Sequence, residues 1–189
     1  MNHFQLIKSF CLTVLILGFF SSCSKEELEN DVQLTNVSVK LKTITGELKK
    51  VYIDIEDVQL KVKQEENTPG TWLSLEAINN GIHNTSDLNN ENALLLVSNF
   101  SVEAGYIYGM RLVLGENNFM DISNVLHSLD VSDLGNSNPT NTVSTQLQHN
   151  KSYVFTIELN KDQSISYDES SSMMVFNPKI QTEIRQFQY

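Results

Sequence analysis

The sequence predicts an all-β protein, an antiparallel β-sandwich that occupies residues 35–189 as a single domain. Apolar and polar residues alternate with a period of two from residue 35 onward, which gives each strand one buried and one wet face. Short apolar runs are separated by Gly, Asn, Asp and Pro, which favour turns. No long amphipathic helical pattern interrupts the series. Many short strands joined by turns are typical of a sandwich.

The first two strands have the clearest pattern. Residues 37–42 and 51–56 alternate strictly between apolar and polar side chains. The phase then slips, because the step from Ile55 to Val58 is odd. A strand cannot keep one face buried across an odd step, so we expect a bulge or break near Glu56–Asp57.

The remaining strands follow at short intervals. We expect them at residues 71–75, 106–114, 119–122, 143–148, 153–159, 164–167 and 173–180, with a strand or a helical turn at 93–97. Gly105 opens the strand 106–114, in which Tyr106 and Tyr108 share one parity with Met110. Residues 79–92 and 123–142 are polar and predict loops.

The N-terminus has the pattern of an export signal. Lys8 lies in a polar head, residues 10–20 are almost entirely apolar, and two serines lead into Cys23. This run is too short for a committed membrane span and is typical of a secretory signal. With a cysteine at the cleavage point, residues 1–22 resemble a bacterial lipoprotein signal, in which Cys23 would carry the lipid, including palmitate. A plain secretory signal with a chance cysteine is the alternative.

Residues 23–34 form an acidic tether after the lipidated cysteine. The run Ser24, Lys25, Glu26 and Glu27 resembles the signal that sends Bacteroidetes lipoproteins to the outer face of the outer membrane. The resemblance implies a protein that is anchored in the outer membrane through lipid on Cys23 and faces the cell exterior. A solvated linker is the simpler interpretation.

Composition argues against some partners and bonds. The chain has 13 Lys and Arg against 23 Asp and Glu, a formal net charge of −10 at pH 7, and no basic run. Such a chain repels nucleic acid, so we expect no nucleic-acid partner. Its two cysteines are Cys11, inside the signal, and Cys23. We therefore expect no intramolecular disulfide in the mature protein.

Several segments in order resemble the DUF4382 domain of exported bacterial and archaeal proteins, a family without an assigned function. They are VSVKLKT (37–43), VYIDIEDVQLKV (51–62), Gly70-Thr71-Trp72, Asp87-Leu88, Leu94-Leu95, Ala104-Gly105, Met110-Arg111-Leu112, FTIELNKDQSI (155–165) and VFNPKI (175–180). The sequence departs from the family pattern at Ile107, Glu158 and Asn160. The resemblance implies a transthyretin-like or prealbumin-like β-sandwich and no reaction.

Two oxygen-rich stretches could be mistaken for calcium loops. Asp87, Asn89 and Glu91 are spaced like the first ligands of such a loop. However, Asn92 occupies the position that requires Gly, and Ser98 occupies the position of the last carboxylate ligand. The second stretch, residues 130–138, is similar. We expect turns made by side-chain-to-backbone bonds at both, and neither a metal nor a cofactor.

Four residues form a possible ligand face: Trp72, Tyr106, Tyr108 and Arg111. The aromatic side chains could stack on sugar rings, or they could be core residues. Arg111 interrupts an apolar strand, on the parity of Ile107 and Val113. It could bind a ligand, but an arginine that pairs with a carboxylate and sets the register is the favoured interpretation.

These observations favour a lipid-anchored cell-envelope module without enzymatic activity, which binds a glycan or another surface protein or plays a structural role in adhesion. The alternative is a small hydrolase whose site the sequence does not reveal. Clustering of His83 or His127 with Asp and Ser in one cleft would favour the hydrolase. An open aromatic patch would favour the binding module.

Overall fold

The computed structural model describes residues 32–44, 46 and 50–188. The signal peptide, Cys23, the run Ser24–Glu27 and most of the tether lie outside the described residues. Val32–Tyr189 form one compact unit. Within the described part of the chain, no helix is both long and apolar enough to cross a membrane.

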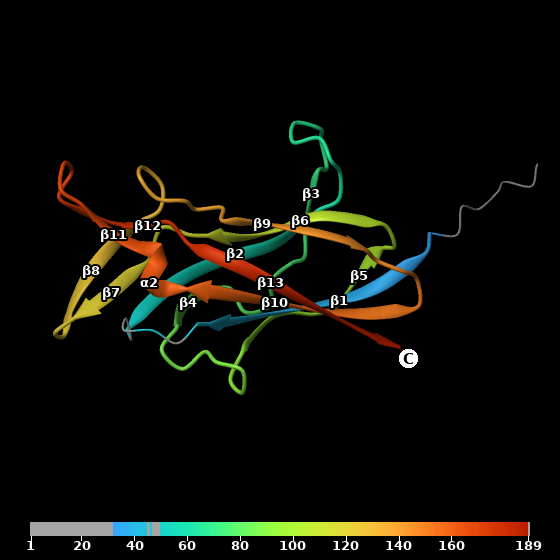
Figure 1. The fold of residues 1–189 in the computed structure, drawn as a ribbon, viewed down its shortest axis with the longest axis horizontal. Helices are drawn as coiled ribbons and strands as arrows, with labels where there is room; N and C mark the ends of the chain where they lie inside the picture. Colours follow the sequence, from blue (N-terminus) through green and yellow to red (C-terminus); the bar gives the residue numbers. More distant parts are fainter. Residues whose placement is uncertain (1–31, 45, 47–49, 189) are drawn as a thin grey trace, which may run out of the picture. The chain divides into compact units, whose positions relative to one another are not determined.

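Two sheets account for almost all of this unit (Figure 1). The smaller one has the strand order β13 (Lys179–Gln188), β10 (Lys151–Asn160), β1 (Leu34–Thr43), β5 (Leu94–Glu103). The larger one runs β11 (Ile165–Asp168), β12 (Met173–Phe176), β8 (Val125–Asp130), β7 (Phe119–Ile122), β2 (Val51–Lys61), β6 (Tyr106–Leu114), β9 (Thr140–Gln146). Two short strands, β3 (Trp72–Ser74) and β4 (Gly81–Asn84), also pair with β2. Among the described residues, one helical turn, α2 (Lys161–Ser164), is the only helix.

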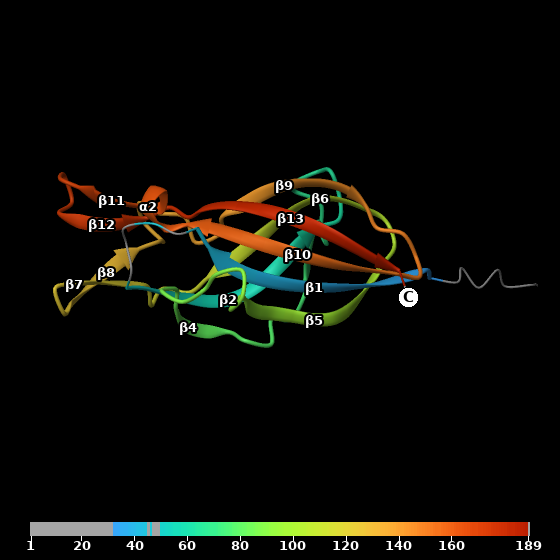
Figure 2. The ribbon, with the colours of Figure 1, turned by 60° about the horizontal axis from the view of Figure 1, so that its bottom comes forward.

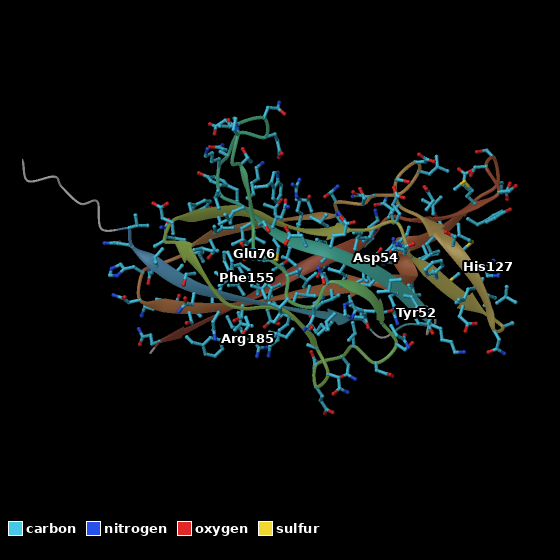
Figure 3. All side chains as sticks on the ribbon, turned by 180° about the vertical axis from the view of Figure 1, so that it is seen from behind. Tyr52, Asp54, Glu76, His127, Phe155 and Arg185 are labelled. Carbon is cyan, nitrogen blue, oxygen red and sulfur yellow. The ribbon has the colours of Figure 1, made fainter. Side chains whose placement is uncertain are left out.

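The core lies between the two sheets. Alternate residues of β1, β2 and β10 are fully buried, including Val39, Ile53 and Phe155 (Figure 3). Burying a side chain of this size contributes about 1.5–3 kcal/mol relative to leaving it exposed. The apolar residues that recur with a period of two in the sequence are therefore the ones that form the core between the sheets. The predicted all-β sandwich is confirmed.

Most strand pairs are antiparallel, as the predicted antiparallel sandwich requires, but two are parallel. β1 pairs with β10 in parallel, from Asn36 opposite Ser152 to Thr43 opposite Leu159. β12 pairs with β8 in parallel over two residues. The other strand pairs are antiparallel. A parallel pair needs a long connection, and here the chain from β2 to β9 supplies it between β1 and β10.

The phase slip in β2 is a bulge, as predicted. Register between β2 and β6 shifts between Ile55 and Asp57. Glu56 is exposed, while Ile55 and Val58 are both fully buried. One extra residue therefore lets both halves of β2 face the same core. Gly105 directly precedes β6, which also agrees with the prediction.

A second slip, in β6, was not predicted. The register with β9 shifts between Ile107 and Gly109. Ile107 is buried, yet Met110 is buried too, so the buried parity changes along the strand. Tyr106 and Tyr108 therefore do not share a face with Met110, and Arg111 does not share one with Ile107. The expected parity of this strand was wrong because a bulge reverses it.

Three segments have more strand than the composition suggested. The polar stretch 79–92 contains β4, and 123–142 contains β8 and the start of β9. Residues 93–97 belong almost entirely to β5, which settles the choice between strand and helical turn in favour of strand. In the two polar stretches, β4 and β8 have few buried side chains, so alternation does not mark them in the sequence.

Candidate functional site

The structure brings the four residues of the predicted ligand face together as two contact pairs on the larger sheet. Trp72 begins β3 and Arg111 lies in β6, on opposite sides of β2. The guanidinium carbon of Arg111 is 4.3 Å from the centre of the Trp72 ring, a cation–π contact. Tyr106 and Tyr108 meet edge to face, with ring centres 4.8 Å apart.

Arg111 has a different partner from the carboxylate that we expected. Its Nε and Nη2 atoms donate to Gln59 Oε1 at 2.8 and 2.5 Å, directly across the β2–β6 register. Burial lowers the pKa of Arg111, and the carboxylates of Glu66 and Asp57 oppose that shift. The contacts of Arg111 thus link β6 to β2 through an amide and to β3 through an aromatic ring, in place of the expected carboxylate pair.

The oxygen-rich loops use their oxygens to build turns. Asn89 Oδ1 accepts from the backbone N–H groups of Glu91 and Asn92 at 2.8 and 3.1 Å. The Asp130 carboxylate accepts from the N–H groups of Leu134 at 2.7 Å and Gly135 at 3.2 Å. Backbone hydrogen bonds of this kind, led by the one from Leu134, lower the pKa of Asp130.

The described histidines lie apart from carboxylates. His83 Nε2 bonds the Asn79 carbonyl oxygen at 3.0 Å, and His149 Nδ1 lies 2.9 Å from Asn150 Nδ2. His127 lies in β8, at the end of the domain that carries the β7–β8 hairpin (Figure 3). Among residues 32–44, 46 and 50–188, no histidine forms an ion pair with a carboxylate.

The outer face of the smaller sheet holds a groove of about 380 Å³, which we call the β10 groove. Val154 and Thr156 of β10 line it between the longer side chains of the two neighbouring strands. Lys40 and Lys42 of β1 line it on one side, with Asn90, Glu91 and Ala93 from the loop before β5. Glu183, Arg185 and Phe187 of β13 line it on the other side.

Strand register explains why this face is hollow. Ser38, Val154 and Arg185 are in register across β1, β10 and β13, and the next outward-facing row is Lys40, Thr156 and Glu183. In the second row Thr156 is shorter than both of its neighbours, and in the first row Val154 is shorter than Arg185 and lies beside the small Ser38. Figure 2 shows β13, β10, β1 and β5 side by side. A groove therefore follows β10, with a floor of two β-branched side chains.

Charged groups line the β10 groove, and most of them are already paired. Lys42 Nζ lies 2.5 Å from Glu158 Oε1 and donates to Asn90 Oδ1 at 2.8 Å. Arg185 Nη2 and Nε both lie 3.0 Å from Glu183 Oε1. The side chain of Lys40 forms no hydrogen bond or ion pair with any described residue. The groove thus offers one free cation among neutralised pairs.

Comparison with known families now adds to this geometry. Residues 34–178 match the family described as a domain of unknown function, DUF4382. The chain belongs to the DUF4382 family. None of the curated proteins matches it. The match begins at the first residue of β1 and ends just before β13. One wall of the β10 groove in this DUF4382 protein therefore lies beyond the matched segment.

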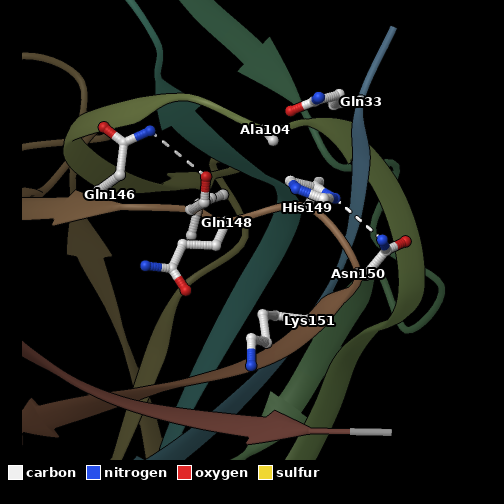
Figure 4. Close-up of a pocket in the computed structure, with 8 residues that line it drawn as sticks. Gln33, Ala104, Gln146, Gln148, His149, Asn150 and Lys151 are labelled. Carbon is white, nitrogen blue, oxygen red and sulfur yellow. Dashed lines mark hydrogen bonds between the residues drawn. The ribbon is translucent and has the colours of Figure 1, made fainter. Parts of the chain in front are cut away.

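A second hollow of about 600 Å³ lies beside the β9–β10 turn of the DUF4382 domain (Figure 4). Its lining includes Gln33, Ala104 and residues 146–151. Amide groups dominate this lining, and backbone bonds between Gly105 and Leu147 hold the two turns together at 2.8 and 3.1 Å. The hollow is next to the start of β1, so the tether enters the domain here.

Sequence reasoning did not find the β10 groove. The signals were present: Lys40 and Lys42 occupy the wet parity of β1, and short or β-branched residues occupy the wet parity of residues 152–156. Only the register of β1, β10 and β13 places these residues side by side. The paired residues of β1 and β10 are 116 positions apart in the sequence, a separation that no local pattern covers.

Proposed function

We propose that this DUF4382 protein is a lipid-anchored, non-enzymatic binding module on the outer face of the outer membrane, and that it captures glycans in the β10 groove. The observation that carries the proposal is the groove itself. Strand β10 forms its floor, and polar side chains of the neighbouring segments line both sides. Its volume of about 380 Å³ is within the range of small-ligand sites, about 300–1,000 Å³.

The lining chemistry suits a carbohydrate. Sugar hydroxyls both donate and accept hydrogen bonds, and the groove offers acceptors at Glu91 and Glu183 and donors at Asn90 and Arg185. Phe187, half-exposed at 51%, supplies an aromatic surface for the apolar face of a sugar ring. Val154 and Thr156 give the floor an apolar component.

The anchoring part of the proposal rests on the sequence. Gln33 is ten positions after the predicted lipidation site Cys23, and an extended chain of that length reaches at most about 36 Å. The domain would therefore stay close to the membrane, tethered at the start of β1. Lipid on Cys23 would make the membrane its first partner, and the Ser24–Glu27 run would direct export to the exterior.

A small hydrolase remains the alternative, and no contact of the described histidines favours it. Binding without turnover separates the two functions. Incubation of the protein with each bound glycan, followed by product analysis, would report hydrolysis directly.

The binding test uses residues 24–189, which contain the whole compact unit, on a glycan array and then in calorimetry with each hit. We expect glycan binding that Phe187→Ala and Arg185→Ala each weaken about tenfold, a loss of about 1.4 kcal/mol. Tyr167→Ala is the matched control, because Tyr167 is an aromatic residue with a similar exposure on β11. A loss in Tyr106→Ala but not in Phe187→Ala would move the site to the larger sheet. Absence of any glycan ligand would refute the proposal.

A further inference from the structure

We propose that the β10 groove selects anionic sugars, and that Lys40 forms the ion pair with their negatively charged group. This inference rests on the proposed function, because it names the class of glycan that the same groove would take. The shared chemistry is a sugar ring that carries a carboxylate or a sulfate group next to its hydroxyls.

The charge pattern of the groove is the first argument. Lys42 is held between Glu158 and Asn90, and Arg185 is held by Glu183, so each of these cations already faces a carboxylate. Lys40 has no such partner among the described residues, and it is exposed. An incoming anion can therefore pair with Lys40 without first breaking an existing ion pair.

The position of Lys40 is the second argument. Val39 and Leu41, its neighbours in β1, are fully buried, so the backbone at Lys40 is fixed in the sandwich. Thr156 lies directly opposite Lys40 on β10 and is much shorter. The ammonium group can therefore reach over the groove floor, where a ligand on Val154 and Thr156 would lie.

The charge of the whole protein is the third argument. With a net charge of −10, the protein repels an anion over most of its surface. Three of its 13 basic side chains, Lys40, Lys42 and Arg185, line this one groove. Glu91 and Glu183 in the same lining disfavour a simple polyanion, because unscreened phosphates would lie against carboxylates. A ligand with hydroxyls and isolated negative groups satisfies both kinds of side chain.

The test measures binding of residues 24–189 to three oligosaccharide probes of equal length by calorimetry at low ionic strength. The probes are an oligogalacturonate, the neutral galactose oligomer and a sulfated galactose oligomer. We expect the anionic probes to bind about fivefold more tightly than the neutral one, the upper range for one exposed ion pair. Raising the ionic strength should reduce this preference.

Two variants test whether Lys40 causes the preference for anionic probes. Lys40→Gln should abolish the preference, so that anionic and neutral probes bind this variant with equal affinity. Lys63→Gln is the matched control, because Lys63 is exposed after β2 and donates to the Pro69 carbonyl oxygen at 2.7 Å. Thermal unfolding of both variants checks that the fold is intact.

The outcomes separate this inference from the proposed function. Equal affinity for neutral and anionic probes, or a preference that survives in Lys40→Gln, would overturn the role of Lys40 and leave the glycan module in place. No binding of any glycan would overturn both. A preference confined to the carboxylate probe or to the sulfate probe would support the inference and identify the acidic group.

Discussion

Arg111 is stacked on the ring of Trp72 and bonded to Gln59, so one arginine joins β3, β2 and β6 on the outer face of the larger sheet. β3 is only three residues long and lies off the main strand order. The contact therefore holds a short strand against the sheet. The Nε and Nη2 atoms of the guanidinium are engaged with Gln59 and its carbon lies over the Trp72 ring, while a ligand-binding role for Arg111 stays a prediction.

The first prediction concerns this contact. Arg111→Lys should lower the free energy of unfolding by about 1–2 kcal/mol, because an ammonium group cannot both stack on the ring and donate twice to Gln59. A double-mutant cycle with Trp72→Ala in urea denaturation should give a coupling of about 0.5–1 kcal/mol. Additive effects of the two changes would contradict the stacking interaction.

The second prediction concerns Gly135. A Cβ atom there would clash with the carbonyl oxygens of Asp130 and Phe176 and lie 2.7 Å from the Cα atom of Val131, all backbone atoms that cannot rotate away. Gly135→Ala should therefore destabilise the domain by about 3 kcal/mol. Gly105→Ala is the control, since no atom lies within 4 Å of its added Cβ. Denaturation midpoints check both, and equal midpoints would count against the packing described.

The third prediction concerns pH and Asp130. Backbone N–H bonds from Leu134, Asp133 and Gly135 lower its pKa below the ordinary 3.8. Because the folded pKa is lower than the unfolded one, the stabilisation is present above the unfolded pKa and is lost as pH falls through the folded pKa. Asp130→Asn should thus be less stable than wild type at neutral pH, with a gap that begins to narrow near pH 4 and closes only once the pH is below the folded pKa. Thermal melts at several pH values measure this, and a gap independent of pH would argue against it.

The fourth prediction concerns calcium. We expect millimolar calcium to change the melting temperature by less than about one degree, because Asn89 and Asp130 already use their oxygens on backbone N–H groups. A site at a hundredfold excess over its dissociation constant would stabilise the fold by about 2.7 kcal/mol, a shift of several degrees. Such a shift, lost in Asp87→Ala, would reveal a calcium site.

The fifth prediction concerns anchoring. Cys23→Ala should abolish acyl labelling and cleavage at this position and release the protein from the membrane or mislocalise it. Each buried CH₂ of the lipid contributes about 0.8 kcal/mol, so two or more chains hold a protein where one does not. Membrane association that persists in Cys23→Ala, with no acyl label in wild type, would refute the lipoprotein assignment.

Replacement of Lys25, Glu26 and Glu27 together by Ala tests the export signal separately. We expect intact lipidation but reduced protease accessibility on whole cells. Unchanged accessibility would remove the export role of this run and leave its role as a tether.

Local pattern in the sequence determined much of this fold. The period of two located β1, β2 and β10, and the odd step after Ile55 located the bulge at Glu56. The sequence predicts these features because successive residues of a strand face opposite sides of the sheet, so the pattern of burial follows the order of neighbouring residues. Three of the segments that resemble DUF4382 begin in these strands, and the family assignment confirms that resemblance.

Tertiary structure alone decided which strands meet and in which direction. Thr35 Oγ1 donates to the Lys151 carbonyl oxygen across 116 residues of chain, at the start of a parallel pair that no local pattern indicates. The same pairing sets Lys40 beside Thr156 and so forms the β10 groove. The reversed parity of β6 and the Gln59 partner of Arg111 likewise follow from register with neighbouring strands. Alternation tells which side chains are buried, but register depends on contacts between distant segments, which only the packed chain defines.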